Sequence, residues 1–271
     1  QSKDILPSCQ GNVSGRMTAM PQFLETPQGR RLAYHRLDGD GPCVVFLGGL
    51  KSDMQGTKAV FLEDWARRQG RAFLRFDYSG HGESSGVFSD GCIGDWAQDS
   101  LAVVTALIDG PIVPVGSSMG GWQALLLARE MPERIAGLVT IAAAPDFTED
   151  GYWASFTDAQ KQQLDAEGQV ELPSDYMEPY VITRRMIDDG RNQLVLRSPL
   201  NLPFPTRFLQ GTSDTAVSVA TAVRLLEHAQ GSDMELKLVK DADHRFSDDK
   251  CLKLMVEALT EVLPEVLTGA V

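Results

Sequence analysis

Short apolar segments alternate along the chain with longer amphipathic ones, and this rhythm predicts the elements of the fold. Short apolar runs are typical of buried strands, whereas apolar positions spaced three or four residues apart are typical of helices. Their alternation indicates an α/β fold, in which helices flank a mostly parallel central sheet. We expect strands at 31–37, 44–47, 72–76, 111–115, 135–142, 206–209 and 235–239, and helices at 58–68, 95–108, 122–130, 220–229 and 252–263.

The alternation is interrupted at residues 146–202, where polar and aromatic residues and several prolines replace it. This stretch is too long for a plain loop in a compact domain. We therefore expect an inserted helical cap or lid at 146–202, lying over the strand ends of a core formed by 21–145 and 203–271. Residues 1–20 are polar and irregular, and we expect a tag or a disordered extension there.

The composition of the chain indicates its domain size and argues against some classes of binding partner. The 271 residues are 43% hydrophobic, which is enough for one large domain with a buried core. A net charge of −12 argues against binding to nucleic acid or to anionic membranes. The longest apolar stretch, at about 135–145, is too short to span a bilayer, and residues 1–20 lack the apolar region of a secretory signal.

The four cysteines are scattered along the chain without paired spacing. This arrangement argues against a zinc site and a disulfide framework, and it indicates a reducing compartment. We therefore expect a cytoplasmic protein without a bound metal, and the sequence makes no prediction about its oligomeric state. The cysteines are Cys9, Cys43, Cys92 and Cys251.

Residues 116–120 read Gly-Ser-Ser-Met-Gly, the pattern G-x-S-x-G, between an expected strand and an expected helix. This context is typical of a nucleophile elbow, a strained turn that exposes a serine hydroxyl at the mouth of the sheet. Glycines fit there because the residues two positions on either side of the serine nearly touch it. We therefore predict Ser118 as the nucleophile, with an ordinary surface turn as the alternative. Pro114, which cannot donate a ladder hydrogen bond, argues against a regular strand before the turn.

A serine hydroxyl needs a base to accept its proton, and the base needs a carboxylate to orient it. In folds of this type the chain order is serine, acid, histidine. This order favours His244, which follows the last expected strand, and Asp214, which follows the strand before it. Asp241 and Asp243 are alternative acids, but a local turn suits them better because they lie so close to His244. An exposed loop residue is the alternative for His244.

Acyl transfer also needs two backbone N–H donors that bind the oxyanion of the tetrahedral intermediate. We predict that Met119, directly after the nucleophile, supplies one of them. The other is expected from Leu50, in the loop after the strand at 44–47. Gly48 and Gly49 in this loop let the backbone approach a substrate, so Gly49 is a candidate substrate-binding residue, with an ordinary turn as the alternative.

With the turn at 77–84, which has the form D-x-x-G-x-G-x-S, these motifs make the chain resemble the serine α/β-hydrolases from about residue 22 onward. The chain is most similar to the branch of mitochondrial acyl-protein thioesterases and acyl-glucuronide esterases. This resemblance implies an α/β-hydrolase fold and cleavage of fatty-acyl thioesters and carboxylic esters without a cofactor. The chain differs from that branch in its cap and in lacking a clear transit peptide. The similar segments are 56–59, 75–80, 115–122 and 243–245.

We therefore predict a serine hydrolase in which Ser118 attacks the acyl carbon of a small-molecule ester or thioester and forms a covalent acyl-enzyme. A non-catalytic binding protein on the same scaffold is one alternative. A peptidase or a carbon–carbon bond hydrolase is another, because a triad does not determine which bond is cleaved. A dehalogenase or an epoxide hydrolase would need an aspartate at position 118.

Several residues of the expected cap are candidates for substrate binding. Arg184 and Arg185 would suit a carboxylate such as that of a glucuronide, with a solvated helix face as the alternative. Trp153 is a candidate for lining an acyl pocket, although ordinary packing beneath the cap explains it equally well. Three other aromatic residues share this expectation, namely Phe156, Tyr176 and Tyr180.

Overall fold

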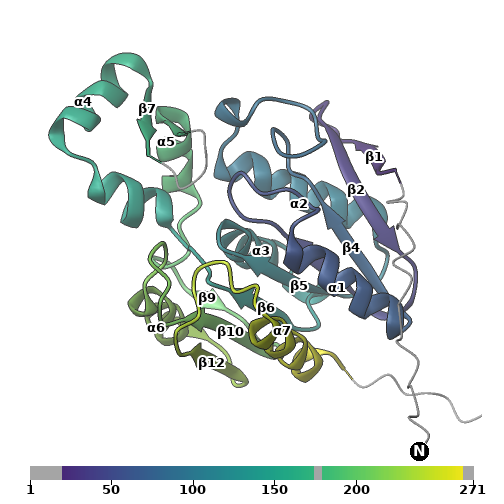
Figure 1. Cartoon of the computed structure of the whole chain (residues 1–271). Coiled ribbons are helices and arrows are strands. Elements are labelled where there is room, and N and C mark those ends of the chain that lie inside the picture. Colours follow the sequence, from purple (N-terminus) through teal and green to yellow (C-terminus); the bar gives the residue numbers. More distant parts are fainter. Residues whose placement is uncertain (1–19, 174–178, 265–271) are drawn as a thin grey trace, which may run out of the picture.

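A computed structural model describes residues 20–173 and 179–264. The strands of its central sheet are β1 (Gln22–Glu25), β2 (Arg31–Leu37), β3 (Asp40–Leu47), β4 (Arg71–Phe76), β5 (Ile112–Ser117), β6 (Leu138–Ile141), β10 (Thr206–Gly211) and β12 (Met234–Val239). Within the described residues they form one eight-stranded sheet in the order β1-β2-β4-β3-β5-β6-β10-β12 (Figure 1). β2 pairs antiparallel with β1 and with β4, whereas the other pairs are parallel. The sheet is therefore mostly parallel, as predicted.

Helices cover both faces of this sheet (Figure 1). α1 (Thr57–Arg68) and α7 (Asp249–Val262) lie on one face, in a cluster with Val44 and Phe46 of β3. On the other face, Val45 and Leu47 belong to the cluster that includes α2 (Ile93–Leu107), α3 (Met119–Glu130) and α6 (Val219–His228). Successive strand residues point to opposite faces, so the continuous apolar run of β3 supplies both layers of the core.

Two expected strands differ in detail from the structure. The strand expected at 135–142 is shortened to β6, because residues Pro132–Arg134 form a 3-10 turn and Ile135 makes only an isolated bridge to Ile112. β5 contains Pro114, but its continuous pairing with β6 begins only at Val115. The missing proline N–H therefore falls where the β5–β6 ladder is already incomplete.

Between β6 and β10 the chain leaves the sheet and forms an insertion that we call the cap (Figure 1). The predicted limits of the cap, 146 and 202, stay a prediction. Near the second limit, β9 (Leu200–Asn201) already pairs with β11 (Ala229–Gln230), which follows α6. The elements of the cap are η3 (Thr148–Trp153, a π-helix), α4 (Asp158–Glu167), β7 (Gln169–Leu172), β8 (Tyr180–Thr183) and α5 (Arg184–Asn192).

The cap is attached to the core mainly through α5. The Asp189 carboxylate accepts a hydrogen bond of 2.6 Å from the Gly94 N–H, in the first turn of α2. Arg185 forms an ion pair of 2.6 Å with Asp95 in the same turn. The Trp122 indole N–H, in α3, donates to the backbone carbonyl that follows α5. These contacts hold the cap against the first turns of α2 and α3.

Some predictions fall outside the described residues. Residues 1–19, which include Cys9, and Tyr176 of the cap are among them. The tag or extension expected at residues 1–20 therefore stays a prediction. Cys43, Cys92 and Cys251 are buried, and their thiols are free. Of the helices in 20–173 and 179–264, none is both long and apolar enough to cross a bilayer.

Candidate active site

Ser118 lies on the sharp turn between β5 and α3. Its backbone has φ 56° and ψ −118°, a strained conformation for any residue other than glycine. Backbone hydrogen bonds to β6 and to the segment that follows it hold this turn in place. The Ser118 N–H donates to the Ile141 carbonyl (2.9 Å), and the Ser118 carbonyl accepts from the Ala144 N–H (3.1 Å). The G-x-S-x-G segment therefore has the strand–turn–helix geometry that the sequence predicts.

The two glycines of this motif are required by close packing. A Cβ atom on Gly116 would lie 2.1 Å from the Gly120 carbonyl oxygen, and one on Gly120 would lie 2.0 Å from the Leu47 carbonyl oxygen. Ordinary contacts between heavy atoms are about 3.5–4.0 Å. A side chain therefore does not fit at either position while the elbow keeps this shape.

The structure brings together the three side chains predicted as a triad. The Nε2 atom of His244 lies 3.0 Å from the Ser118 Oγ, although the two residues are 126 positions apart. The Nδ1 atom of the same ring lies 2.8 Å from the Asp214 Oδ2. These distances match a nucleophile, a base and an orienting carboxylate in hydrogen-bonded sequence.

The alternative acids lie elsewhere in the histidine's own loop. Asp243 accepts a hydrogen bond of 3.1 Å from the Phe246 N–H, as expected for a local turn. Asp241 has a positive φ of 64°, and its N–H donates to the Thr212 hydroxyl. Of the three candidate acids, Asp214 is the one that the structure pairs with the His244 ring.

Asp214 is completely buried at its side chain, yet it is well supplied with donors. Its carboxylate accepts from the Gln210 amide (3.0 Å) and from the N–H groups of Ala216 (2.9 Å) and Val217 (2.8 Å). Burial raises the pKa of Asp214, but the hydrogen bonds from His244 and Val217 outweigh it, and the pKa lies below the ordinary value. The ionised carboxylate fixes Nδ1 as the ring's donor and leaves Nε2 as the acceptor for the serine proton.

The loop after β3 lies directly against the elbow. A Cβ atom on Gly49 would lie 3.4 Å from the Ser118 Cβ. Leu50 follows in this loop, and Met119 is the first residue of α3, where a backbone N–H has no intrahelical partner. Within the described part of the chain, the N–H groups of Leu50 and Met119 donate to no other group. Their role as an oxyanion hole stays a prediction.

The D-x-x-G-x-G-x-S turn, residues 77–84, forms hydrogen bonds with the loop after β3 and with the residues that follow it. The Tyr78 hydroxyl donates to the Gly48 carbonyl (3.3 Å), and the Asp77 carboxylate accepts from the N–H groups of Met54 (2.6 Å) and Glu83 (2.9 Å). Burial raises the pKa of Asp77 to about 6, although these N–H donors oppose the shift. The motif therefore positions the backbone next to the nucleophile.

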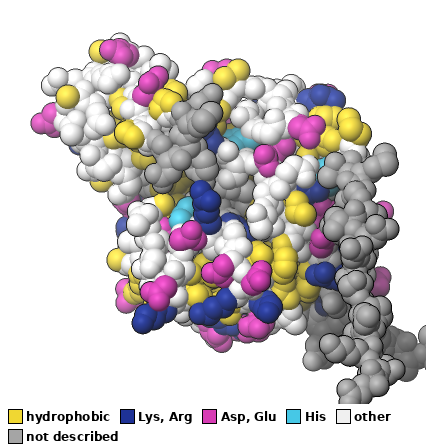
Figure 2. Space-filling model, viewed as in Figure 1, with side chains coloured by type: hydrophobic (Ala, Val, Ile, Leu, Met, Phe, Trp, Pro, Cys, Tyr) yellow, Lys and Arg dark blue, Asp and Glu magenta, His cyan; other side chains and the backbone are white. Residues whose placement is uncertain are grey.

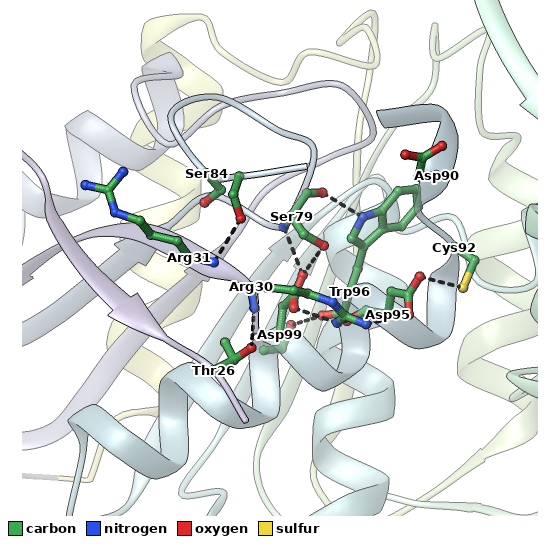
Figure 3. Close-up of polar contacts among 12 residues, drawn as sticks. Thr26, Arg30, Arg31, Ser79, Ser84, Asp90, Cys92, Asp95, Trp96 and Asp99 are labelled. Carbon is green, nitrogen blue, oxygen red and sulfur yellow. Dashed lines mark hydrogen bonds and ion pairs between the residues drawn. The ribbon is translucent and has the colours of Figure 1, made fainter. Parts of the chain in front are cut away.

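A charged cluster ties this turn to the rest of the molecule (Figure 3). Arg30 lies 2.8 Å from Asp99 and 2.6 Å from Asp95, both on α2. The second oxygen of the fully buried Asp99 accepts from the N–H (2.9 Å) and the hydroxyl (2.6 Å) of Ser79. Asp95 also pairs with Arg185 of the cap. Because each of these charges has a partner, the cluster is a structural junction between the β1–β2 turn, α2 and the cap.

The two arginines predicted as a carboxylate clamp are engaged within the protein. Arg184 pairs with Asp188 (2.7 Å) and with Asp165, and it is exposed on the cap. Arg185 pairs with Asp95 and donates to the Asp90 carbonyl. Both guanidinium groups therefore bind carboxylates of this chain. A substrate carboxylate would have to compete with these internal partners for either guanidinium group, and the clamp stays a prediction.

Trp153 is likewise engaged within the cap. Its ring lies 4.6 Å from the Arg191 guanidinium and 5.1 Å from the Lys161 ammonium, as in cation–π contacts. Its predicted role in an acyl pocket stays a prediction.

A row of aromatic side chains runs from the elbow helix into the cap, and two of its members, Phe147 and Tyr152, were not predicted from the sequence. The row begins at Trp122, whose ring centroid lies 5.5 Å from that of Phe147, and it continues to Tyr152 (5.4 Å) and Phe156 (6.3 Å). Figure 2 shows that the surface is indented where the cap meets the core, and that a histidine lies at the edge of this indentation. The sequence indicates that residues 146–202 are rich in aromatic side chains. Composition alone does not show which of these rings contact one another.

Comparison with known proteins identifies the family. A family model described as "Alpha/beta hydrolase family" matches residues 44–262. This chain belongs to the alpha/beta hydrolase family. The mitochondrial palmitoyl-protein thioesterase ABHD10 of Bos taurus is 33% identical to this hydrolase, covering 91% of the chain and 81% of that protein. Its Homo sapiens counterpart is 32% identical, covering 97% and 84%.

Solved structures agree with this assignment. A putative hydrolase from Agrobacterium vitis S4 has a TM-score of 0.87 and 36% identity, covering 90% of this chain and 98% of that one. Alpha/beta hydrolase domain-containing protein 10 from mouse has a TM-score of 0.83 and 30% identity, with the same coverage. The predicted fold class and the resemblance to the mitochondrial thioesterase branch are therefore confirmed.

These relatives also correct one prediction. The curated relatives that match at least 91% of this chain are all named as mitochondrial proteins. The predicted cytoplasmic location is therefore wrong. It depended on unpaired cysteines, and free thiols indicate a reducing environment without identifying the compartment.

Proposed function

We propose that this alpha/beta hydrolase is a serine hydrolase that cleaves fatty-acyl thioesters and carboxylic esters through a covalent acyl-enzyme. The observation that carries this proposal is the hydrogen-bonded line from the Ser118 Oγ through the His244 ring to Asp214, with distances of 3.0 and 2.8 Å. We assign the N–H groups of Leu50 and Met119 as the donors to the negative charge that develops on the carbonyl oxygen in this reaction.

In the first half of the reaction, the Ser118 Oγ attacks the acyl carbon while the His244 Nε2 accepts its proton. Asp214 stabilises the imidazolium that results. The oxyanion accepts hydrogen bonds from Leu50 and Met119, each contributing about 2.7–4 kcal/mol to lowering the barrier. The bond to the leaving sulfur or oxygen then breaks, and His244 returns the proton to that atom. The thiol or alcohol departs, and the acyl group remains as an ester of Ser118.

In the second half, a water molecule attacks the acyl-enzyme. His244 accepts a proton from the water as its oxygen bonds to the acyl carbon, and the same two N–H groups bind the oxyanion again. The bond to the Ser118 Oγ then breaks, and the serine recovers its proton from His244. The products are a carboxylic acid and the free enzyme.

Two observations favour an acyl chain of some length as the substrate. The curated relatives named above are palmitoyl-protein thioesterases. The half-buried side chains of Phe147 and Tyr152 provide apolar surface between the elbow helix and the cap. Apolar contact of this kind stabilises a bound alkyl chain by about 25 cal/mol per Å² removed from water.

The test compares the protein with its Ser118→Ala variant on a palmitoyl thioester and on the oxygen ester of the same acyl chain. The unmodified protein is expected to hydrolyse the thioester and to be labelled stoichiometrically by a fluorophosphonate. The variant is expected to do neither while keeping its far-UV circular dichroism. Equal turnover by the two proteins would contradict the proposal, as would a folded wild type that neither reacts nor turns over.

A further inference from the structure

Lys58 reaches from α1 to the loop that carries His244, residues 241–247, which we call the histidine loop. Its side chain is half-buried, and its Nζ donates to the Arg245 carbonyl oxygen, 187 positions away. α1 packs against α7, the helix that follows the histidine loop. The contact therefore joins the base's loop to a helix from the other half of the chain.

The histidine loop has a backbone shape that needs support from its surroundings. Asp241 and Phe246 have positive φ angles of 64° and 50°, which are strained for side chains of this size. The Phe246 ring is completely buried, and its N–H donates to the Asp243 carboxylate. The Arg245 carbonyl accepts from the Ser247 hydroxyl (2.8 Å) as well as from Lys58. Lys58 therefore binds the strained segment between His244 and the buried ring.

The charged form of Lys58 is destabilised by its surroundings in the folded protein. Burial lowers the pKa of Lys58 from an ordinary 10.5 to about 8, although attraction to the Asp243 carboxylate opposes the shift. At neutral pH the folded protein therefore keeps an ammonium that would be more stable in water. Residues that oppose stability in this way are common where activity depends on geometry.

We propose that Lys58 is a positioning residue, which holds the Arg245 carbonyl so that the His244 Nε2 stays within hydrogen-bonding distance of the Ser118 Oγ. α1 begins at Thr57, seven residues after Leu50, so Lys58 joins the histidine loop to the helix that follows the predicted oxyanion donor in the chain. This inference rests on the proposed function, because Lys58 acts on the reaction only through His244.

The test replaces Lys58 by methionine, which has a similar length but neither the charge nor the donor. Because a misplacement of the base by about 1 Å costs up to about 10²-fold in rate, Lys58→Met is expected to lower kcat at least about tenfold, with KM within about twofold. Its Tm is expected to equal or exceed that of the wild type, because the desolvated ammonium is gone. Lys58→Arg, which keeps a donor, is expected to recover most of the lost kcat.

A matched control and a second variant sharpen the result. Lys237→Met removes an ammonium from an ion pair with Glu261 at the other end of α7, and it is expected to leave kcat unchanged. Lys58→Gln keeps a polar end but is too short to reach the carbonyl, so it is expected to lose as much kcat as Lys58→Met and serves if the methionine variant does not fold.

The outcomes separate this inference from the proposed function. If the wild type shows no more turnover than Ser118→Ala, the proposed function fails whatever Lys58 does. If the wild type is active and Lys58→Met and Lys58→Gln keep its kcat, the positioning role is refuted. A loss of kcat that is matched by a lower Tm and is not recovered in Lys58→Arg would show a merely structural role and would also overturn the inference.

Discussion

Asp214 shows how a single charge can be both fully buried and ionised. Among residues 20–173 and 179–264, no guanidinium or ammonium group pairs with its carboxylate, which instead accepts from one imidazole, one amide and two backbone N–H groups. Hydrogen bonds to the charged form favour that form even where water is excluded. The anion is thus directed at the Nδ1 of His244, where it selects the tautomer that leaves Nε2 free to act as a base.

Replacement of Asp214 by asparagine is expected to lower kcat by about 10³–10⁴-fold, because the amide no longer selects the reactive tautomer of His244. KM is expected to change little, since the side chain of Asp214 is completely buried behind the His244 ring. The measurement is steady-state kinetics on a palmitoyl thioester, with circular dichroism as the check on folding. A loss of less than tenfold in a folded variant would show that Asp214 is not the orienting acid.

At the scale of an element, the elbow depends on the backbone of its neighbours. Gly120 lies in the first turn of α3 and faces the carbonyl of Leu47, at the end of β3. Neither group can move without shifting a central strand or the nucleophile. The space at Gly120 is therefore fixed by the same contact that holds the loop after β3 beside Ser118.

Gly120→Ala is expected to reduce the free energy of unfolding by about 1–3 kcal/mol or more, because the new methyl group overlaps the Leu47 carbonyl. Activity is expected to fall with it, since relief of the overlap displaces Ser118. Gly110→Ala is the matched control, because nothing lies within 4 Å of a Cβ atom there. Chemical denaturation of both variants checks the expectation, and equal stabilities would contradict it.

The elements themselves could be predicted well where an apolar pattern is continuous. A helix was expected at 252–263, and α7 spans Asp249–Val262, with an earlier start because the Asp248 side chain caps it. The Ser118 turn was predictable because packing forces glycine at fixed positions. The contacts of Lys58 with Arg245 and of Arg185 with Asp95 were not predictable. The partners in each pair lie far apart in the sequence and meet only after folding. No local sequence pattern around one residue indicates its partner.

At the scale of the whole molecule, stability depends on a few buried charges that connect separate parts of the chain. Arg30 is part of the β1–β2 turn region and contacts Asp95 and Asp99 of α2, and Asp99 in turn binds Ser79 (Figure 3). The Asp99 side chain is fully buried. The loss of one member of such a cluster leaves another charge without compensation in a medium of low polarity.

Arg30→Met is expected to lower the free energy of unfolding by about 3 kcal/mol, because Asp99 would remain buried without its cation. Arg184→Met is the control, since Arg184 pairs with carboxylates on the exposed surface of the cap, and its Tm is expected to stay the same. Thermal melting and denaturant titration of the two variants are the measurements. A Tm and a midpoint unchanged in Arg30→Met would show that the cluster contributes little.

Asp77 gives the stability of the protein a pH dependence of its own. Its pKa is about 6 in the folded chain against an ordinary 3.8. Between these values the folded chain binds more protons at this site than the unfolded chain does. The contribution of Asp77 to stability therefore increases as the pH falls through 6 and is complete below about 4.

The measurement compares the free energy of unfolding of the wild type and of Asp77→Asn from pH 7 to pH 4.5. The wild type is expected to gain stability relative to the variant as the pH falls. The pKa is checked separately by the carboxyl ¹³C shift of Asp77, with an expected midpoint near pH 6. Parallel stability curves, together with a midpoint near 4, would contradict the expectation.

Every member of the triad lies at or just beyond the end of a core strand, whereas the cap enters as one insertion between β6 and β10. The residues proposed as the triad and the residues of the cap therefore come from separate stretches of the sequence. Mutations in the insertion can change the surface of the cap while the strands of the core stay the same. Substitutions in the insertion are therefore expected to change which substrate binds without moving Ser118, Asp214 or His244.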